Sequence, residues 1–149
     1  MKIEDAINTV FKSPQQKAIV NIRYTSNFIY GIQTEFMMEF DLSMPQFNIL
    51  RILRGAKKAI NVNTVKERMI EKSPNTTRLM DKLVAKNLII RSHSNEDRRV
   101  VFVEISKLGL TLLQNIDAKL AENNIFRDHL SDEESEILSD LLDKVRNAI

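Results

Sequence analysis

The feature that most constrains this chain is a set of local signals that start helices. Ser43 precedes Gln46 by three residues, with Pro45 between them; at this spacing the serine side chain caps the helix and the glutamine bonds back to the cap. Ser131 and Glu134 repeat the pattern near the C-terminus. With three Gly and three Pro in 149 residues, the chain has few breaks between helices. The sequence therefore predicts long helices joined by short loops.

Apolar residues repeat with a helical period over both ends of the chain. We expect helices over residues 3–11, 15–39 and 44–54, with Gly55 ending the third. Another long helix follows Ser106, and a last one follows near the C-terminus. The apolar faces of these terminal helices are wide enough to favour packing against partner helices.

The middle of the chain predicts two short helices separated by a tight turn. Asn61 or Asn63 can cap the first helix. Ser73 as the cap and Pro74 at the first position start the second, and Asn87 ends it in a left-handed conformation. The polar residues expected on the side opposite its leucines are Asn75, Thr76, Thr77, Arg78 and Lys82. This pattern is typical of a helix-turn-helix.

A β-hairpin is expected directly after the second helix. Its strands span residues 88–92 and 100–105, and the turn between them carries Asp97, Arg98 and Arg99. A hairpin in this place is a wing, and arginine suits a narrow, A·T-rich minor groove. Asp97 lies on the same side of an extended strand as Arg99, so it can orient the guanidinium through a bidentate ion pair.

The charge is distributed unevenly along the chain. The net charge is +2, but residues 54–107 hold thirteen basic and six acidic residues, a net of +7. The parts before and after this segment sum to −5. A basic middle favours a polyanion as partner, although composition alone fits an unevenly charged solvated surface equally well.

Several classes of protein are excluded by what the sequence lacks. There is no cysteine, which rules out disulfides and thiol-based sensing and favours a reducing cytoplasm. No signal peptide or run of about 18 apolar residues is present, so we expect no membrane association. His93 and His129 are the only histidines, and we expect no metal and no cofactor. Without a Gly-rich phosphate loop or a nucleophile elbow, we expect no enzyme.

The order of these elements resembles the MarR family of bacterial winged-helix transcription regulators over nearly the whole chain. The wing signature Asp-x-Arg, followed by an alternating strand and then Leu-Thr and Gly, corresponds to Asp97-Arg98-Arg99 through Ile105-Ser106 to Gly109. Residues 73–83 are similar to the family's recognition helix. Two departures, Ile105-Ser106 for Leu-Thr and Asn87 for Gly, keep the physical role of each position.

The resemblance implies a mainly α fold with a small β-hairpin wing, in which the winged helix-turn-helix is flanked by N- and C-terminal dimerisation helices. Residues 1–149 would form a single domain, with residues 1–40 and 107–149 in dimerisation and residues 43–106 in DNA binding. It further implies a homodimer on double-stranded DNA. The dimer would act as a repressor on a pseudo-palindromic operator and would be released by a small-molecule effector.

Three groups of site residues follow from the resemblance. The expected DNA contacts are Ser73, Asn75, Thr76, Thr77, Arg78 and Lys82 in the recognition helix, and Asp97, Arg98 and Arg99 in the wing. Expected phosphate contacts are Lys57, Lys58, Lys66 and Arg68. The expected lining of an effector pocket between the dimerisation helices and the winged domain is Arg23, Tyr24, Phe28, Tyr30 and Met37.

The same residues also allow simpler interpretations. Ser73 can serve only as a helix cap, Arg78 can be a solvated surface cation, and the lysines can serve solubility. Asp97 and Arg99 can merely stabilise the hairpin turn, and aromatic or Met residues at helical spacing are usually core. The alternative function is a winged-helix protein that binds nucleic acid nonspecifically, or another protein, without operator specificity.

Overall fold

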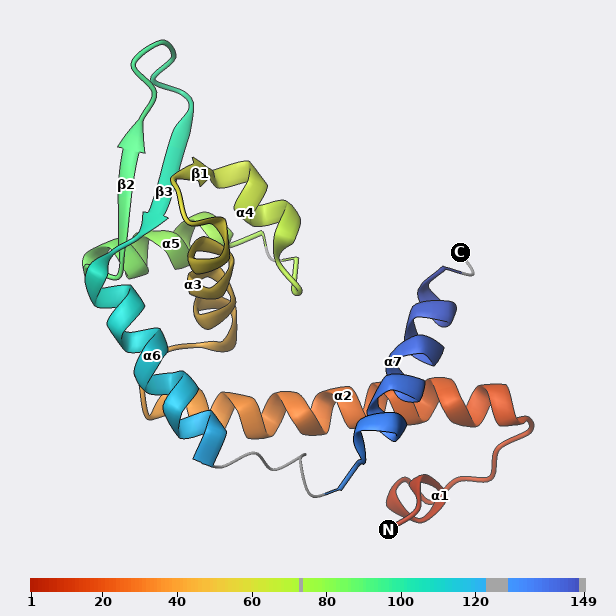
Figure 1. The fold of residues 1–149 in the computed structure, drawn as a ribbon. Coiled ribbons are helices and arrows are strands. Elements are labelled where there is room, and N and C mark those ends of the chain that lie inside the picture. Colours follow the sequence, from red (N-terminus) through yellow and green to blue (C-terminus); the bar gives the residue numbers. More distant parts are fainter. Residues whose placement is uncertain (73, 123–128, 148–149) are drawn as a thin grey trace. The chain divides into compact units, whose positions relative to one another are not determined.

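The computed structural model describes residues 1–72, 74–122 and 129–147 of the chain (Figure 1). Within these residues the fold is mainly helical with a small antiparallel sheet. The helices are α1 (Ile3–Ala6), α2 (Pro14–Met38), α3 (Met44–Ala56), α4 (Val62–Arg68), α5 (Thr76–Ala85), α6 (Lys107–Glu122) and α7 (Asp132–Arg146). The strands are β1 (Ile60–Asn61), β2 (Ile89–His93) and β3 (Val101–Ile105).

The chain divides into two compact units, Met1–Leu110 and Thr111–Ile149. The first unit holds every element from α1 to β3 together with the first turn of α6, and the second holds the rest of α6 and α7. A single domain over residues 1–149 stays a prediction. No helix in the described part of the chain is long and apolar enough to cross a membrane.

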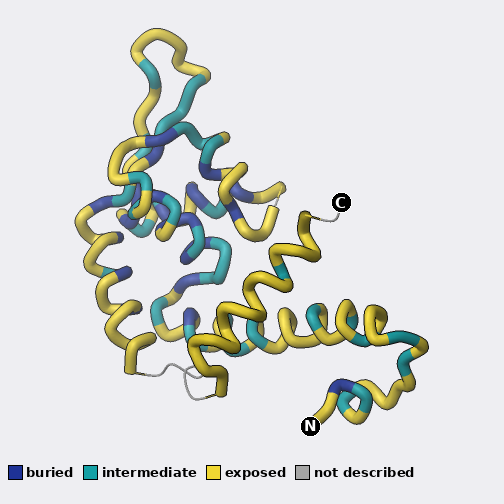
Figure 2. Tube along the Cα trace, turned by 45° about the vertical axis from the view of Figure 1, so that its right-hand side comes forward, coloured by how far each residue is buried: buried dark blue, intermediate teal, exposed yellow. Residues whose placement is uncertain are grey.

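Most of the core of the first unit lies in the segment from α3 to β3, here called the winged body (residues 44–105). α3 is its central helix and packs against α4, α5 and β3. Ile49, Leu50 and Leu53 on α3 are buried, as are Met80 and Leu83 on α5. Figure 2 shows buried positions gathered in this segment. The helix-turn-helix therefore folds around its own apolar core.

The sheet confirms the predicted wing. Its strand order is β1-β3-β2 with antiparallel pairing throughout. Ile89 pairs with Ile105 at the base of the hairpin, and His93 pairs with Val101 near its tip. Ile60 of β1 pairs with Val103 on the other edge of β3, so the start of α4 is tied to the wing.

The predicted helix starts at Ser43 and Ser131 are confirmed. Ser43 Oγ accepts a hydrogen bond from the Gln46 N–H, and Gln46 Oε1 accepts one from the Ser43 N–H at 3.0 Å. Ser131 exchanges the same pair of bonds with the residue three positions on. At the start of α4 the cap is Asn61, whose Oδ1 accepts from the Asn63 N–H at 2.7 Å.

The first predicted helix is wrong in length. A helix was expected over residues 3–11, but α1 ends at Ala6, and Asn8 has a left-handed φ of 48°. Short helices gain too few backbone bonds to stand alone, so tertiary contacts decide their extent. Here the contact is an ion pair between Glu4 on α1 and Lys17 on α2.

The predicted end of the third helix is also wrong. Gly55 lies inside the last turn of α3, which continues to Ala56. The left-handed residue that stops the helix is Lys57, with a φ of 55°. Lys57 is exposed, and a left-handed conformation costs a non-glycine residue about 1–2 kcal/mol. The surrounding fold, and not a local preference of lysine, therefore determines where α3 stops.

The junction between the wing and α6 is close-packed. Ser106 caps α6, as expected, because its Oγ accepts from the Gly109 N–H at 3.0 Å. The Ser106 N–H donates to the Leu88 carbonyl oxygen at 3.0 Å. A Cβ atom at Gly109 would lie only 2.3 Å from this same oxygen, so the junction accepts no side chain at this position.

Candidate nucleic-acid interface

The second helix of the helix-turn-helix, α5, has one apolar and one polar face. Thr76, Met80 and Leu83 are buried against the rest of the winged body. Four residues of α5 with polar or charged side chains are exposed: Thr77, Arg78, Asp81 and Lys82. The outward face of α5 therefore combines two cations, a hydroxyl and one carboxylate.

The start of α5 differs from the prediction. The helix begins at Thr76, after Pro74 and Asn75 in a turn, and Asn75 makes no side-chain cap bond. Thr76 is only 1% exposed, so it lies on the inward face and not opposite the leucines as expected. Burial of the Thr76 side chain determines which face of α5 points inward. A capping signal alone does not show this. Ser73 lies outside the described residues.

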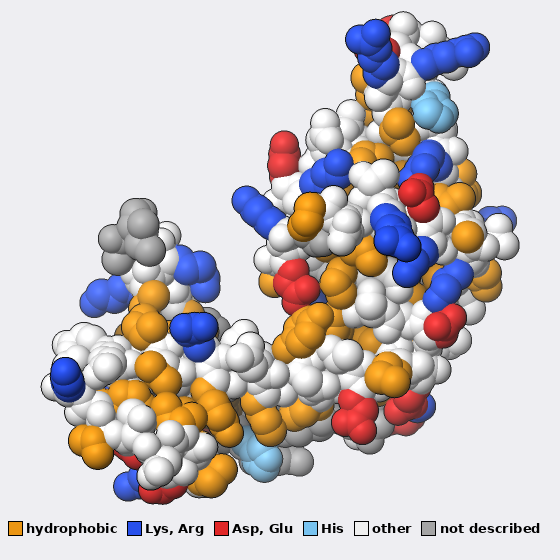
Figure 3. All heavy atoms as spheres, turned by 180° about the vertical axis from the view of Figure 1, so that it is seen from behind, with side chains coloured by type: hydrophobic (Ala, Val, Ile, Leu, Met, Phe, Trp, Pro, Cys, Tyr) orange, Lys and Arg blue, Asp and Glu red, His pale blue; other side chains and the backbone are white. Residues whose placement is uncertain are grey.

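The wing loop is ordered by its own hydrogen bonds. Ser94 Oγ accepts from the N–H groups of Glu96 and Asp97, and His93 Nδ1 lies 3.0 Å from the Arg98 carbonyl oxygen. Asp97 Oδ1 accepts from the backbone N–H of Arg99 at 2.9 Å. The bidentate ion pair expected between these two side chains is not formed, because the carboxylate closes the turn instead. Arg98 and Arg99 are exposed at the tip, where Lys and Arg side chains project into solvent (Figure 3).

Two hollows border α5. One of 270 Å³ is lined by residues of β1, α4, α5, β2, β3 and the wing loop, which are Asn61, Val62, Asn63, Thr77, Arg91, Arg99, Val100 and Val101. It brings the recognition-helix residue Thr77 together with the wing residue Arg99. The second, of 300 Å³, is lined by Lys66, Lys72, Pro74 and Thr76. It places Lys66 beside the start of α5.

The remaining predicted phosphate contacts line neither hollow. Lys57 and Lys58 lie in the link between α3 and β1, and Arg68 is the last residue of α4. All three are exposed. The structure thus leaves their side chains open to solvent, and their contact with phosphates stays a prediction.

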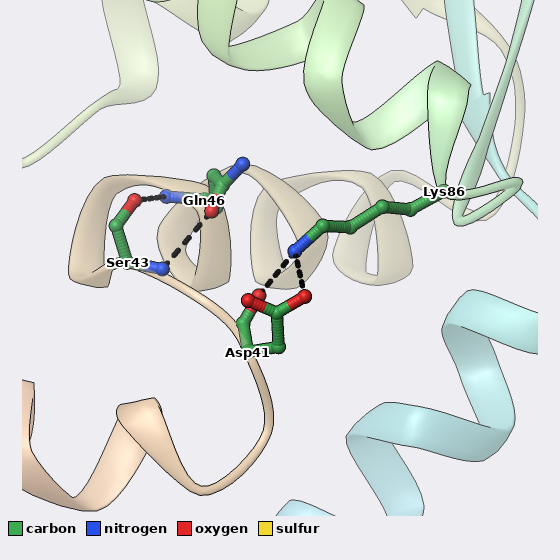
Figure 4. A network of polar contacts seen from close by, with 4 residues as sticks. All are labelled: Asp41, Ser43, Gln46 and Lys86. Carbon is green, nitrogen blue, oxygen red and sulfur yellow. Dashed lines mark hydrogen bonds and ion pairs between the residues drawn. The ribbon is translucent and has the colours of Figure 1, made fainter.

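The C-terminal end of α5 is tied to the turn that precedes α3. Lys86 Nζ donates to the backbone oxygen of Asp41 and to Asp41 Oδ2, the latter at 2.7 Å (Figure 4). The next residue, Asn87, has the predicted left-handed conformation, with a φ of 57°. These contacts hold the end of the helix in place, which is what reading a groove requires of its scaffold.

The predicted effector residues are all on α2 but differ in burial. Arg23, Tyr24, Phe28 and Tyr30 are exposed, with Phe28 at 59%. Met37 is only 1% exposed and lies in the last turn of α2, where its carbonyl oxygen accepts from the Leu42 N–H. Met37 is thus a core residue in the described chain, whereas the aromatic side chains remain accessible.

An ion pair that the sequence did not predict joins α5 to the wing. Arg91 Nη2 lies 2.6 Å from Asp81 Oδ1, joining β2 to the outward face of the helix. The only signal in the sequence was that Arg91 carries a charge near the end of an apolar strand segment. Nothing in the spacing identifies Asp81 as its partner. In the described residues, no group of three or more His, Asp or Glu side chains is placed to hold a metal ion.

The segment of the chain that carries this face matches a known protein family. A sequence model of the MarR family matches residues 42–101. The uncharacterized HTH-type transcriptional regulator YpoP of Bacillus subtilis is 33% identical over 73% of this chain and 77% of its own length. A second B. subtilis regulator, YfiV, is 39% identical over 55% of this chain, and the match spans about half of that protein, 51%.

Solved structures share the fold. A MarR-like transcription regulator from Bacillus cereus has a TM-score of 0.80 at 19% identity, covering 91% of this chain and 97% of its own. A mutant of E. coli MarR, solved with operator DNA, has a TM-score of 0.74 at 22% identity over 86% and 93% of the two chains. BpsR of Bordetella bronchiseptica, whose DNA binding is regulated by 6-hydroxynicotinic acid, has a TM-score of 0.74 at 22% identity over 87% and 98%. With its confirmed wing and helix-turn-helix, the chain belongs to the MarR family of winged-helix transcription regulators.

Proposed function

We propose that this chain is a sequence-specific DNA-binding regulator. The observation that carries the proposal is the shared hollow at which Thr77 of α5 and Arg99 of the wing meet. A helix that reads the major groove and a wing that reaches the minor groove must act on one duplex, so their contact residues must face the same side. Arg78 and Lys82 on α5 and Arg98 in the wing loop add exposed positive charge to the two elements.

The proposed contacts divide between bases and phosphates. Arg78 and Thr77 read base edges in the major groove, where an arginine donates two hydrogen bonds to guanine. Arg99 enters the minor groove, and its backbone is fixed by Asp97. Lys66 on α4, which lines the hollow beside the start of α5, neutralises a phosphate. A mutant of E. coli MarR that shares this fold was solved with operator DNA, which supports DNA as the partner.

We propose that the regulator acts as a homodimer on a pseudo-palindromic operator. α7 buries none of its side chains within the described chain. Leu141 and Ile137 are 55% and 60% exposed on one stripe of this helix, and Leu138 and Val145 extend the stripe. A second copy would cover this stripe. On a two-fold symmetric site the two recognition helices would lie about one helical turn apart, roughly 34 Å.

The proposed mode of regulation is repression relieved by a small molecule. The exposed Tyr24, Phe28 and Tyr30 with Arg23 on α2 offer aromatic surface and one cation to an amphipathic anion. The regulation of BpsR by 6-hydroxynicotinic acid supports an effector of this chemical class. We propose further that the protein works in the cytoplasm and catalyses no reaction.

The test begins with selection of binding sites. The wild-type protein selects duplexes from a random-sequence library, and the affinity for the selected duplex is compared with that for a scrambled duplex over a range of salt concentrations. A specific regulator selects an inverted repeat and prefers it by about 10³-fold or more. Selection of no site, with all binding lost along a steep salt slope, would instead support nonspecific nucleic-acid binding.

A further inference from the structure

One carboxylate lies on the face that we propose reads DNA. Asp81 is on the outward side of α5, between Arg78 one turn before it and the adjacent Lys82. Its side chain is 53% exposed. A carboxylate here would repel the phosphate backbone, and it is also at the i, i+3 spacing at which Arg78 could form an ion pair with it.

The structure gives this carboxylate a different partner. Asp81 Oδ1 lies 2.6 Å from Nη2 of Arg91, which comes from β2 and is 28% exposed. The Nε atom of Arg91 is buried without a hydrogen-bond partner. In the part of the chain that the structure describes, Arg78 makes no ion pair and keeps its guanidinium exposed. Its donors therefore remain free for another acceptor.

We propose that Arg91 is a positioning residue that holds Asp81 and thereby keeps Arg78 available for DNA. The inference rests on the proposed function, because it gives the wing a second role beside its own DNA contact. Arg91 acts in two ways: it takes up the carboxylate that would otherwise pair with Arg78, and it neutralises a charge that would face phosphates. Arg91 acts through Asp81 and Arg78 and makes no DNA contact of its own.

The expected loss of DNA affinity in a variant without Arg91 follows from these two effects. An exposed i, i+3 ion pair on a helix shifts an equilibrium by about twofold. One uncompensated charge near a phosphate in water adds about a further threefold to fivefold. Arg91→Met is therefore expected to weaken binding to the selected duplex by about fivefold to tenfold. Binding to scrambled DNA, which Arg78 does not read, is expected to fall by less.

The experiment compares four variants by fluorescence anisotropy on the selected and scrambled duplexes, with thermal unfolding measured in parallel. Arg91→Met alone weakens specific binding. Asp81→Asn added to Arg91→Met restores the affinity for the selected duplex to within about twofold of wild type, because no carboxylate is left at position 81 to pair with Arg78. Glu104→Gln on β3, added to Arg91→Met, gives the same net charge as the Asp81→Asn double variant. It is expected not to restore the affinity. Arg51→Met, an exposed charge loss on α3, changes affinity by less than about twofold.

Failure to rescue by Asp81→Asn would overturn the proposal, since a direct contact between Arg91 and DNA, or a purely structural role for the ion pair, leaves the double variant weak. Equal rescue by Glu104→Gln would also overturn it, because net charge would then explain the effect. Arg78→Ala separates these outcomes from failure of the proposed function: if it leaves the preference for the selected duplex unchanged, Arg78 reads no base and the proposed contacts are wrong.

Discussion

The winged body buries its apolar side chains, whereas α7 leaves its own exposed. Met80, Leu83 and Val103 are fully buried among the helices and strands between α3 and β3. In α7, no described residue is buried, and Leu141 is 55% exposed on a helix of 15 residues. The difference indicates that the winged body obtains its core from this chain, while α7 needs a partner surface to obtain one.

The two regions also differ in charge. The basic excess of +7 in residues 54–107 coincides closely with the winged body and leaves the flanking parts at −5. The surface proposed for DNA and the surface proposed for a second copy therefore carry opposite charge. Changes in the winged body are expected to act on DNA binding or intrinsic stability, and changes in α7 are expected to act on association.

The largest expected effect is on association. Replacing Leu141 and Leu142 together by Glu is expected to convert the proposed dimer into monomers, because each leucine buried at the interface contributes about 1.5–3 kcal/mol and a buried carboxylate opposes association. Light scattering coupled to size-exclusion chromatography measures the mass. Binding to an inverted repeat should be lost with the dimer.

The control is on the same helix, on the side opposite Leu141. Ser139 is exposed and bonds only to the carbonyl oxygen of Ser135 one turn earlier, so Ser139→Glu is expected to leave the mass unchanged. A dimer that persists in the double leucine variant would show that another surface holds the two copies together.

The second effect is on the intrinsic stability of the first unit. Gly109→Ala is expected to lower the free energy of unfolding by about 1–3 kcal/mol, since the new Cβ would lie 2.3 Å from the Leu88 carbonyl oxygen and the junction of wing and α6 must shift. Gly31→Ala on α2 meets no atom within 4 Å and should raise stability by about 0.5–1 kcal/mol. Urea titration at fixed protein concentration measures both. Equal effects would mean that the close packing at Gly109 carries no energetic cost.

Local chemistry in the sequence was enough to predict most helix starts. Ser43 and Ser131 cap through bonds to residues three positions away, so the signal and the structure occupy the same few residues. Asn87 is left-handed, as its side chain permits. The hairpin followed from strand alternation and its polar turn. These features depend on contacts within a short stretch of chain.

Features that depend on tertiary contacts were wrong or were missed. The phase of α5 is set by burial of Thr76, and α1 stops at Ala6 although its apolar pattern continues to Phe11. The ion pair between Asp81 and Arg91 joins a helix to a strand, so no local spacing reveals it. The sequence thus predicted the elements of the candidate site and most of its exposed side chains, but not the burial of Thr76 or the ion pair between Asp81 and Arg91.

A third prediction concerns the proposed reading of bases. Arg78→Ala is expected to cost about 1–3 kcal/mol in binding to the selected duplex and to relax preference at one base pair, because an arginine–guanine pair is lost. Thermal stability should stay unchanged, since Arg78 is exposed and makes no ion pair within the described residues. A loss that is uniform over all sequences would assign Arg78 to a phosphate.

A fourth prediction concerns the wing. Arg99→Ala is expected to weaken binding by about fivefold to tenfold and to leave stability nearly unchanged, because its guanidinium is exposed and makes no bond within the described residues. The effect should be largest on duplexes with A·T-rich flanks. Wild-type affinity in this variant would remove the minor-groove contact from the proposal.

The smallest expected effect is on the tie between α1 and α2. The hydrogen bond from Lys17 holds the pKa of the Glu4 carboxyl below its usual value, with help from the backbone of Glu4. A carboxyl whose pKa is lower when folded contributes stability above its unfolded pKa and loses it as the pH falls through the folded pKa. Docking of α1 should therefore weaken below the ordinary range of a glutamate, about pH 4, and Glu4→Gln should remove this acid dependence. Amide hydrogen exchange at Ile7 and Thr9, which donate to carbonyl oxygens of α1, measures the change. Exchange that depends on acid equally in both proteins would show that contacts other than the Glu4–Lys17 ion pair hold α1.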